Sequence, residues 1–235
     1  MKIIAIASRK GGVGKTTIAG HLAVQAERSG LGPVGLMDID PQGNLSDWWN
    51  ARPVASPLYV RIPLARLGQE IANLSKQGLS YLFVDTPPTV NSDVGDLIAL
   101  SDLVVIPTRP GPHDLRSIGA TIDLVERLGR PLVFVVNAAV ANARITNETL
   151  ALLSRHGHLA PTVIHQRVAF ASSMTDGRTV MELAPKSPGS EEIESLWSYL
   201  HQRIARSGPP AALTLGAPTA AATAAAEARV AGSQR

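Results

Sequence analysis

The sequence predicts an α/β protein, with a doubly wound, mostly parallel β-sheet and helices on both faces. Short apolar runs of strand length alternate along the chain with longer segments whose apolar residues recur at helical spacing. The runs are continuously apolar, which is typical of parallel strands buried on both sides. Apolar residues make up 45% and charged residues 17% of the 235 residues, enough for a substantial core. In such a sheet a ligand is expected at the carboxyl ends of the strands.

Six apolar runs are expected to form the strands. In chain order they are residues 3–7, 34–37, 81–84, 103–106, 132–136 and 162–164. Five segments with apolar residues three or four positions apart are expected to be helices, and they are residues 16–29, 63–77, 113–128, 145–155 and 190–206. Gly30 lies where the first helix should end, and Ser190 is the expected N-cap of the last one.

The chain is expected to form one domain, residues 1–206, followed by a tail, residues 207–235. The tail is rich in Ala, Pro and Thr and has few large apolar residues, a composition typical of disorder. It has no basic face opposite a bulky apolar face, so a membrane anchor is not expected. No apolar run reaches the roughly 18 residues of a membrane span, and the first apolar run is too short for a signal peptide. We therefore expect a cytoplasmic protein with no membrane partner.

Cysteine content excludes several classes of protein. The sequence contains no cysteine, so it has no disulfide framework, thiolate zinc site, cysteine-held iron–sulfur cluster or cysteine nucleophile. The formal net charge of +3 is compatible with an anionic partner but does not identify one.

A glycine-rich segment between the first strand and the first helix carries the strongest functional signal. Residues 10–17 read Lys-Gly-Gly-Val-Gly-Lys-Thr-Thr. The glycines let successive backbone N–H groups face a phosphate, and the following helix adds its positive end. Lys15 can reach the β- and γ-phosphates, and the Thr16 hydroxyl can ligate Mg²⁺. The residues expected to bind the nucleotide here are Gly11, Gly12, Val13, Gly14, Lys15, Thr16 and Thr17.

Carboxylates follow two other predicted strands. The second strand leads into Met-Asp-Ile-Asp-Pro-Gln-Gly-Asn, in which Asp38 and Asp40 lie at the carboxyl end of the strand. The third strand ends at Asp85, the arrangement in which an aspartate holds Mg²⁺ through water. A carboxylate beside the phosphate loop can hold Mg²⁺ or orient water. Thr16, Asp38 and Asp85 are therefore the expected metal-binding residues.

Two departures from the usual phosphate loop point to a family. Arg9 stands where the usual pattern begins with glycine, and Lys10 precedes the double glycine. Together with the Asp-Pro-Gln-Gly-Asn segment, this resembles the deviant Walker A loop of the ParA/MinD family of P-loop ATPases, and the resemblance covers residues 1–206. It implies ATP and Mg²⁺ as cofactors and a homodimer that sandwiches ATP, in which Lys10 reaches the partner's nucleotide. The alternative for Lys10 is a solvated lysine near its own phosphates.

The same resemblance assigns further roles. It implies that Asp40 positions the attacking water, so that Lys10, Lys15 and Asp40 form the catalytic set. It also implies that Asn137 reads adenine, and that the segment containing Gln166 walls the base. Asn137 offers both a donor and an acceptor, although it is also a plausible turn residue.

The resemblance implies a function for the hydrolysis. Iron–sulfur branches of the family need cysteine, and MinD-like proteins need a basic amphipathic C-terminal helix, so the small ParA type remains. Such an ATPase binds DNA nonspecifically as an ATP dimer and releases it when a ParB-like or adaptor protein stimulates hydrolysis, which makes it nucleoid-associated when ATP-bound. The expected DNA-binding residues are Arg167, Arg178, Lys186 and Arg203, with Arg144 and Arg155 next. Ordinary surface charge or intramolecular ion pairs could account for any of them.

Two other functions are compatible with the fold. One is an ATP-dependent small-molecule ligase or synthetase of the dethiobiotin synthetase branch, against which Lys10 and the Asp-Pro-Gln-Gly-Asn segment argue. The other is a module that binds nucleotide without hydrolysis, against which the intact Lys15, Asp40 and Asp85 argue.

Overall fold

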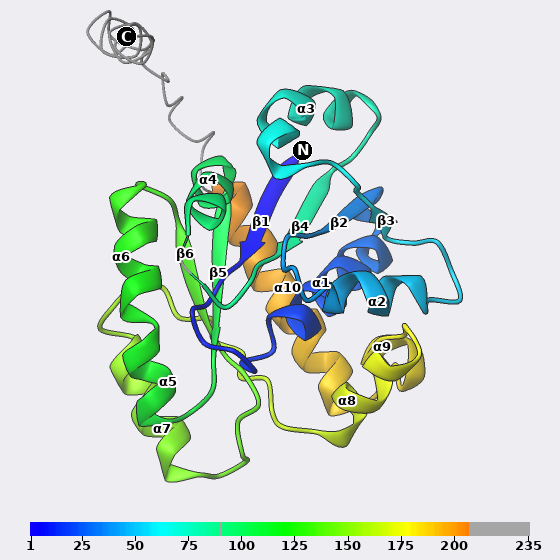
Figure 1. Cartoon of the computed structure of the whole chain (residues 1–235). Helices are drawn as coiled ribbons and strands as arrows, with labels where there is room; N and C mark the ends of the chain where they lie inside the picture. Colours follow the sequence, from blue (N-terminus) through cyan, green and yellow to red (C-terminus); the bar gives the residue numbers. More distant parts are fainter. Residues whose placement is uncertain (90, 207–235) are drawn as a thin grey trace, which may run out of the picture.

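A six-stranded β-sheet lies at the centre of the protein, with the strand order β3-β2-β4-β1-β5-β6 (Figure 1). The computed structural model describes residues 1–89 and 91–206, so the predicted tail at 207–235 lies outside the described residues. The strands are β1 (Lys2–Ile6), β2 (Val34–Asp38), β3 (Leu58–Tyr59), β4 (Tyr81–Asp85), β5 (Leu103–Thr108) and β6 (Leu132–Val136). All neighbouring strands are parallel, which confirms the predicted α/β sheet.

Parallel pairing brings the ends of the central strands together. In the ladder between β1 and β4, Ile6 lies beside Asp85, and in the ladder between β2 and β4, Asp38 also lies beside Asp85. The phosphate loop, which follows β1, therefore starts at the same edge of the sheet as two acidic strand ends. This is the edge at which a ligand was expected.

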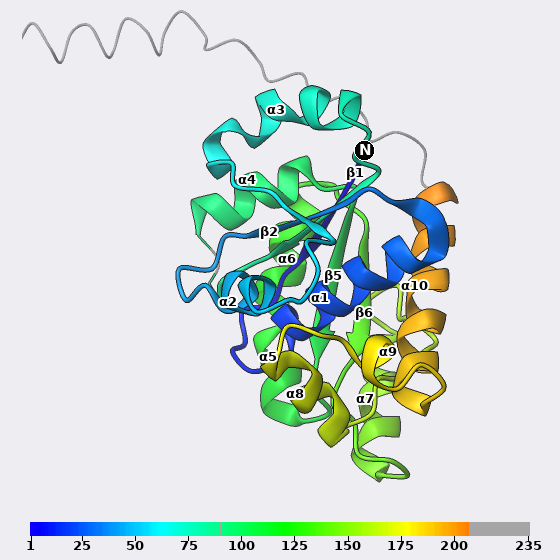
Figure 2. The same ribbon diagram turned by 90° about the vertical axis from the view of Figure 1, so that its right-hand side faces the viewer.

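Helices cover both faces of the sheet, as Figure 2 shows from the side. One face is covered by α1 (Lys15–Ala26), α2 (Asn44–Asn50) and α10 (Pro188–Arg206). The other face is covered by α3 (Leu64–Lys76), α4 (Ser92–Leu100), α6 (Gly119–Arg127) and α7 (Arg144–Leu153). The remaining helical segments are the π-helical turn η1 (Glu27–Leu31), α5 (Pro112–Ser117), α8 (Val168–Thr175) and α9 (Val180–Leu183).

The core forms because alternate residues of each strand face opposite layers. Ile4 and Ile6 of β1 belong to the core shared with α1 and α10, whereas Ile3 belongs to the core shared with α3 and α4. On the first face, Trp197 of α10 packs against Phe83 with ring centroids 5.7 Å apart. These contacts attach α10 firmly to the sheet.

One predicted strand is wrong. Residues 162–164 make no strand, and only isolated bridges, between Phe134 and Leu159 and between Ala139 and His165, join this part of the chain to β6 and the loop after it. Pro161 has no backbone N–H to donate, which limits the ladder that this segment can make. The short edge strand β3 and the helices α2, α4, α8 and α9 were not predicted.

Two helices differ from their predicted limits. The helix expected at 113–128 is divided at Ile118 into α5 and α6, where Gly119 weakens the helix. The last helix begins at Pro188, so Ser190 lies inside it rather than capping it. Ser187 provides the cap instead, because its Oγ accepts from the Ser190 N–H at 3.3 Å and proline suits the first helical position. In the part of the chain that the structure describes, no helix is long and apolar enough to cross a membrane.

Candidate nucleotide-binding site

The phosphate loop connects β1 to α1 and is held from the side by Asn137. Gly14 directly precedes α1 with φ +90°, a left-handed conformation that favours glycine. The buried Asn137 side chain donates from Nδ2 to the Val13 carbonyl at 2.7 Å. A Cβ atom on Gly14 would lie 2.3 Å from that Nδ2, so only glycine fits. The loop conformation thus depends on a residue from the end of β6.

The two lysines of the loop have different surroundings. Lys15 is buried, and its Nζ donates to the Lys10 carbonyl at 3.3 Å. Burial lowers the pKa of Lys15, and the charges of Asp85 and Asp40 oppose this shift. Lys10 is half-buried, and its Nζ makes no hydrogen bond or ion pair with any residue that the structure describes. Lys15 therefore belongs to its own loop, whereas the Lys10 ammonium is available to another group.

Thr16 and Asp85 meet at the base of the loop. The Thr16 hydroxyl donates to Asp85 Oδ2 at 2.5 Å, and Asp85 Oδ1 accepts from the Thr86 N–H at 3.0 Å. Asp85 is almost fully buried, and this burial raises its pKa to about 7. A hydroxyl and a carboxylate at this position are the hard oxygen ligands that suit Mg²⁺ bound together with phosphate. The residues present therefore fit a magnesium ion.

Asp38 and Asp40 have different roles in the loop after β2. Asp38 Oδ1 accepts from the Asp40 N–H at 2.9 Å, and its Oδ2 accepts from the N–H groups of Leu45 and Ser46, both at 3.0 Å. Asp38 therefore holds the first turn of α2, and burial raises its pKa. Asp40 instead lines the pocket. Its Oδ1 accepts from the Gln42 N–H at 2.9 Å, and its Oδ2 has no hydrogen-bond partner among the residues that the structure describes.

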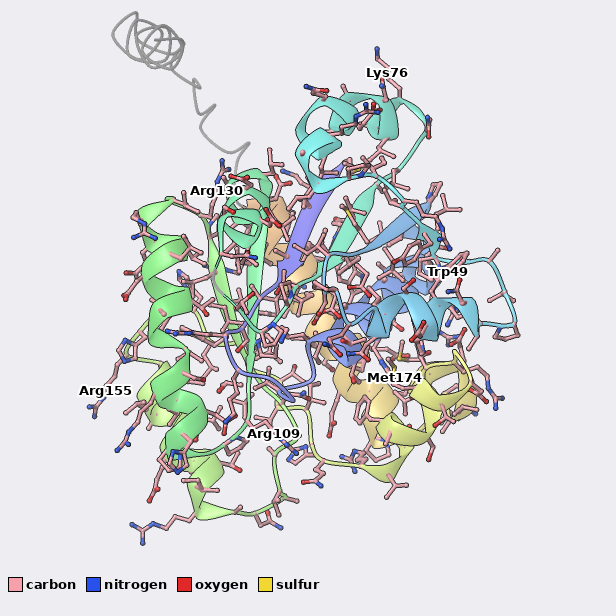
Figure 3. All side chains as sticks on the ribbon, viewed as in Figure 1. Trp49, Lys76, Arg109, Arg130, Arg155 and Met174 are labelled. Atoms are coloured by element: carbon pink, nitrogen blue, oxygen red, sulfur yellow. The ribbon has the colours of Figure 1, made fainter. Side chains whose placement is uncertain are left out.

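A pocket of about 630 Å³ adjoins the phosphate loop and is lined by three of the predicted catalytic and metal-binding residues, Lys15, Thr16 and Asp40, but not by Lys10, Asp38 or Asp85. It continues between α2 and α8, where it is lined by Trp48 and by Met174, which Figure 3 labels. Trp48 is buried in the core, whereas its neighbour Trp49 is half-buried and donates from Nε1 to the Pro57 carbonyl at 2.7 Å. The lining residues that the sequence predicted are Gly11, Gly12, Gly14, Lys15, Thr16, Thr17 and Asp40.

A second pocket of about 690 Å³ shares Gly12, Gly14 and Thr17 with the first. Asn137 and Gln166, the two residues expected to contact adenine, both line it. Its size and its continuity with the loop suit a nucleoside. The structure thus places the two residues expected to contact adenine in a second pocket next to the phosphate loop.

Sequence reasoning missed Arg109 and Phe170, which also line the second pocket. Arg109 directly follows β5, so the rule that ligands bind at the carboxyl ends of strands could have found it (Figure 3). Phe170 is a buried residue of α8, a helix that was not predicted, and no sequence signal identified it.

The four predicted DNA-binding residues have different surroundings. Arg167 lines the second pocket and forms an ion pair with Glu192, with Nη2 and Oε1 2.6 Å apart. Arg178 is exposed and paired with Asp176. Lys186 is exposed just before α10, but Arg203 lies 15 residues beyond Pro188, about 22 Å along the helix. The structure thus places Arg167 at the second pocket, in an ion pair, and its assignment to a DNA surface stays a prediction.

The two candidates placed next to these differ in their surroundings. Arg144 forms an exposed ion pair with Glu148 one helical turn away, at 2.7 Å. Arg155 is exposed beyond the end of α7 (Figure 3).

This fold and site define a P-loop nucleotide-binding protein. Residues 4–180 match the family model described as the CobQ/CobB/MinD/ParA nucleotide binding domain, and the chain belongs to this family. The predicted ParA/MinD resemblance and ATPase activity are thereby confirmed.

Relatives of the chain act in positioning and partition. The chain is 27% identical over 203 residues to "Maintenance of carboxysome distribution protein A" of Halothiobacillus neapolitanus, covering 82% of this chain and 93% of that protein. It is 27% identical over 239 residues to the "Chromosome-partitioning ATPase Soj" of Thermus thermophilus, covering 86% and 96%. Neither name favours the synthetase alternative.

Solved structures confirm the fold. The septum site-determining protein MinD of Pyrococcus horikoshii, complexed with Mg-ADP, superposes with a TM-score of 0.72 at 18% identity, covering 86% of this chain and 96% of that one.

Proposed function

We propose that this protein is a DNA-partition or cargo-positioning ATPase. An ATP-bound homodimer binds DNA nonspecifically, and hydrolysis stimulated by a ParB-like or adaptor protein releases it. The relatives support this proposal because one is named for carboxysome distribution and another for chromosome partitioning. Since those cargoes differ, the partner protein supplies the choice of cargo. The protein acts in the cytoplasm and associates with the nucleoid when ATP is bound.

The environment of Lys10 is the observation that carries the proposal. Lys15 is buried on its own loop, but the Lys10 ammonium has no hydrogen-bond or ion-pair partner among residues 1–89 and 91–206. An ammonium beside the phosphate loop and free of intramolecular pairing is suited to contact the nucleotide of a second copy. Such a cation in trans stabilises the charge that develops during phosphoryl transfer.

Each remaining residue of the site has a proposed part in hydrolysis. ATP is bound by Gly11, Gly12, Val13, Gly14, Lys15, Thr16 and Thr17, with Asn137 and Gln166 at the base. Mg²⁺ would be held by Thr16 and, through water, by Asp85, and it supplies charge neutralisation at the β- and γ-phosphates. Asp38 supports this site by holding the loop that carries Asp40. Asp40 orients the attacking water from the pocket.

Binding to random-sequence duplex DNA, measured with ATP, ADP or no nucleotide across a salt series, tests the proposal. We expect binding with ATP only, with an affinity that falls steeply as salt rises, because cations on the protein displace counterions from DNA. The variant Lys186→Glu should weaken binding without changing ATP affinity, whereas Lys76→Glu on α3 is the matched control. No DNA binding in any nucleotide state, together with steady ATP turnover by the protein alone, would contradict the proposal.

A further inference from the structure

One carboxylate on α10 organises a wall of the second pocket. Glu192 Oε1 accepts from His165 Nδ1 at 2.8 Å and from Arg167 Nη2 at 2.6 Å. Its Oε2 accepts from the His165 backbone N–H at 3.1 Å. The Glu192 side chain is only 13% exposed, whereas those of His165 and Arg167 are 33% and 32% exposed, so these bonds are partly shielded from water. A single side chain thus holds two residues of the segment that lines the pocket.

This segment is also fixed from its other side. The Gln166 N–H donates to the Ala139 carbonyl at 2.9 Å, in the loop that follows β6. Arg167 has an extended backbone, with φ −140° and ψ 140°. Gln166 lies between His165 and Arg167 and lines the same pocket as they do, so its position on the lining depends on where Glu192 holds them.

Glu192 lies on α10, a helix that is packed against the sheet. It lies in the first half of α10, where the neighbouring Ile193, Leu196 and Trp197 are buried against the sheet. The segment that lines the pocket is therefore fixed relative to the hydrophobic core by the Glu192 carboxylate, and not by the loop alone. In addition, Arg167 Nε is buried with no hydrogen-bond partner among the described residues, which leaves one donor for an acceptor on a ligand.

We infer that Glu192 is a positioning residue for the nucleobase: through His165 and Arg167 it sets the wall that carries Gln166, and so sets the preference for adenine over other bases. This inference rests on the proposed function, since it assumes that the second pocket takes the base of ATP. The base, and not the phosphates, is the part of the ligand that Glu192 controls.

Three probes, each measured with Mg²⁺, separate binding of the base from binding of the phosphates. They are ATP, GTP and inorganic tripolyphosphate. In Glu192→Ala we expect the Kd for ATP to rise about tenfold, the scale of one charge-assisted hydrogen bond, and the ATP preference over GTP to shrink. Tripolyphosphate has no base, so its Kd should stay unchanged. In hydrolysis assays the KM for ATP should rise while kcat is retained.

Glu194→Gln is the matched control, because it removes one exposed carboxylate from the same helix. Glu192→Gln keeps the volume of the side chain and should give a smaller loss of ATP affinity. If Glu192→Ala does not fold, Arg167→Met removes the other side of the same ion pair and should also reduce the preference for ATP over GTP. An unchanged ATP preference in both Glu192 variants would overturn the inference. So would an equal loss of tripolyphosphate binding, or an equal effect of Glu194→Gln. Failure of the wild-type protein to bind ATP would instead contradict the proposed function.

Discussion

Gly14 illustrates how tightly single residues of the phosphate loop are constrained. Its φ of +90° favours glycine, and a Cβ atom at this position would lie only 2.3 Å from Asn137 Nδ2. Gly14→Ala should therefore abolish measurable ATP binding, because the new methyl group displaces Asn137 from the Val13 carbonyl. Titration calorimetry measures this loss.

Gly12 provides the comparison, since it has φ +74° but nothing within 4 Å of its Cβ position. Gly12→Ala adds backbone strain, of the order of 1 kcal/mol, without the collision. If both variants lose ATP binding equally, the contact with Asn137 is not what makes Gly14 essential.

Asp40 should separate ATP binding from hydrolysis. Asp40→Ala removes the carboxylate that faces the pocket, so we expect hydrolysis to slow by about 100-fold or more while ATP is still bound. Asp123→Ala removes an exposed carboxylate from α6 and should hydrolyse ATP at the normal rate. Phosphate release in the presence of the activating partner is the measurement, and normal turnover by Asp40→Ala would exclude its proposed role.

The sequence predicts the local chemistry of this site better than its long-range contacts. Lys15 and Thr16 follow from the motif and its place between a strand and a helix. The ion pair of Arg167 with Glu192 does not, because it joins residues 25 positions apart that only the packing of α10 brings together. The hydrogen bond from Asn137 to the Val13 carbonyl joins residues 124 positions apart, and the sequence likewise did not predict it.

At the scale of elements, the helix that follows the Asp40 loop is joined to α9. Arg52, whose side chain is 2% exposed, lies beyond the end of α2 and forms an ion pair with Glu182 of α9, with Nη2 and Oε1 2.9 Å apart. It also donates to the Gly177 carbonyl at 2.6 Å and stacks on Trp48, 4.8 Å from the ring centroid. These contacts therefore join the end of α2 to α9 and to the turn that precedes it.

Glu182→Ala tests the strength of this link. It leaves the buried Arg52 guanidinium without its carboxylate and also removes the bonds that Glu182 accepts from the Thr179 N–H and hydroxyl. Together these losses should lower the free energy of unfolding by about 3 kcal/mol. Glu148→Ala, which removes an exposed ion pair with Arg144, should cost less than about 0.5 kcal/mol. Urea denaturation of both variants makes the comparison, and similar losses would show that the Arg52 pair is no stronger than a surface pair.

Element prediction failed where helices are short or where tertiary contacts replace periodicity. Helix α9 has four residues, too few to show a helical pattern, and its capping box between Thr179 and Glu182 was not recognised. Residues 162–164 are apolar enough to suggest a strand, but the chain makes only isolated bridges there. The longer buried strands, such as β4 and β6, were predicted within two residues of their observed ends.

At the scale of the whole molecule, His21 makes stability depend on pH. It is fully buried between α1 and α9, where its Nδ1 donates to the Thr17 carbonyl at 2.8 Å and its Nε2 accepts from the Val180 N–H at 3.1 Å. Both partners together require the neutral ring. Burial accordingly lowers the pKa of His21 from 6.5 to about 4.

The sign of the effect follows from proton uptake. Between pH 6.5 and about 4 the unfolded chain binds a proton at His21 that the native protein excludes, so stability falls as pH falls through this range. Asp85, whose pKa is raised by burial, contributes in the opposite direction. The His21 contribution is therefore measured by urea denaturation, as the difference between wild type and His21→Gln in the slope of the free energy of unfolding against pH. His158→Gln, at an exposed position, is the control. Equal slopes in wild type and His21→Gln would contradict it.

At the largest scale, the proposed role of Lys10 makes a prediction about assembly. If its ammonium contacts the partner's nucleotide, Lys10→Ala should bind ATP with near-normal affinity but remain monomeric, because the buried Lys15 still serves its own loop. Lys76→Ala removes an exposed lysine at the far end of α3 and should dimerise like the wild type (Figure 3). Light scattering after size-exclusion chromatography, with ATP and the Asp40→Ala background to prevent turnover, measures the mass. If the Lys10 variant still forms a dimer with ATP, Lys10 is not needed for dimer formation. Its ammonium would then be assigned to the nucleotide bound by its own subunit.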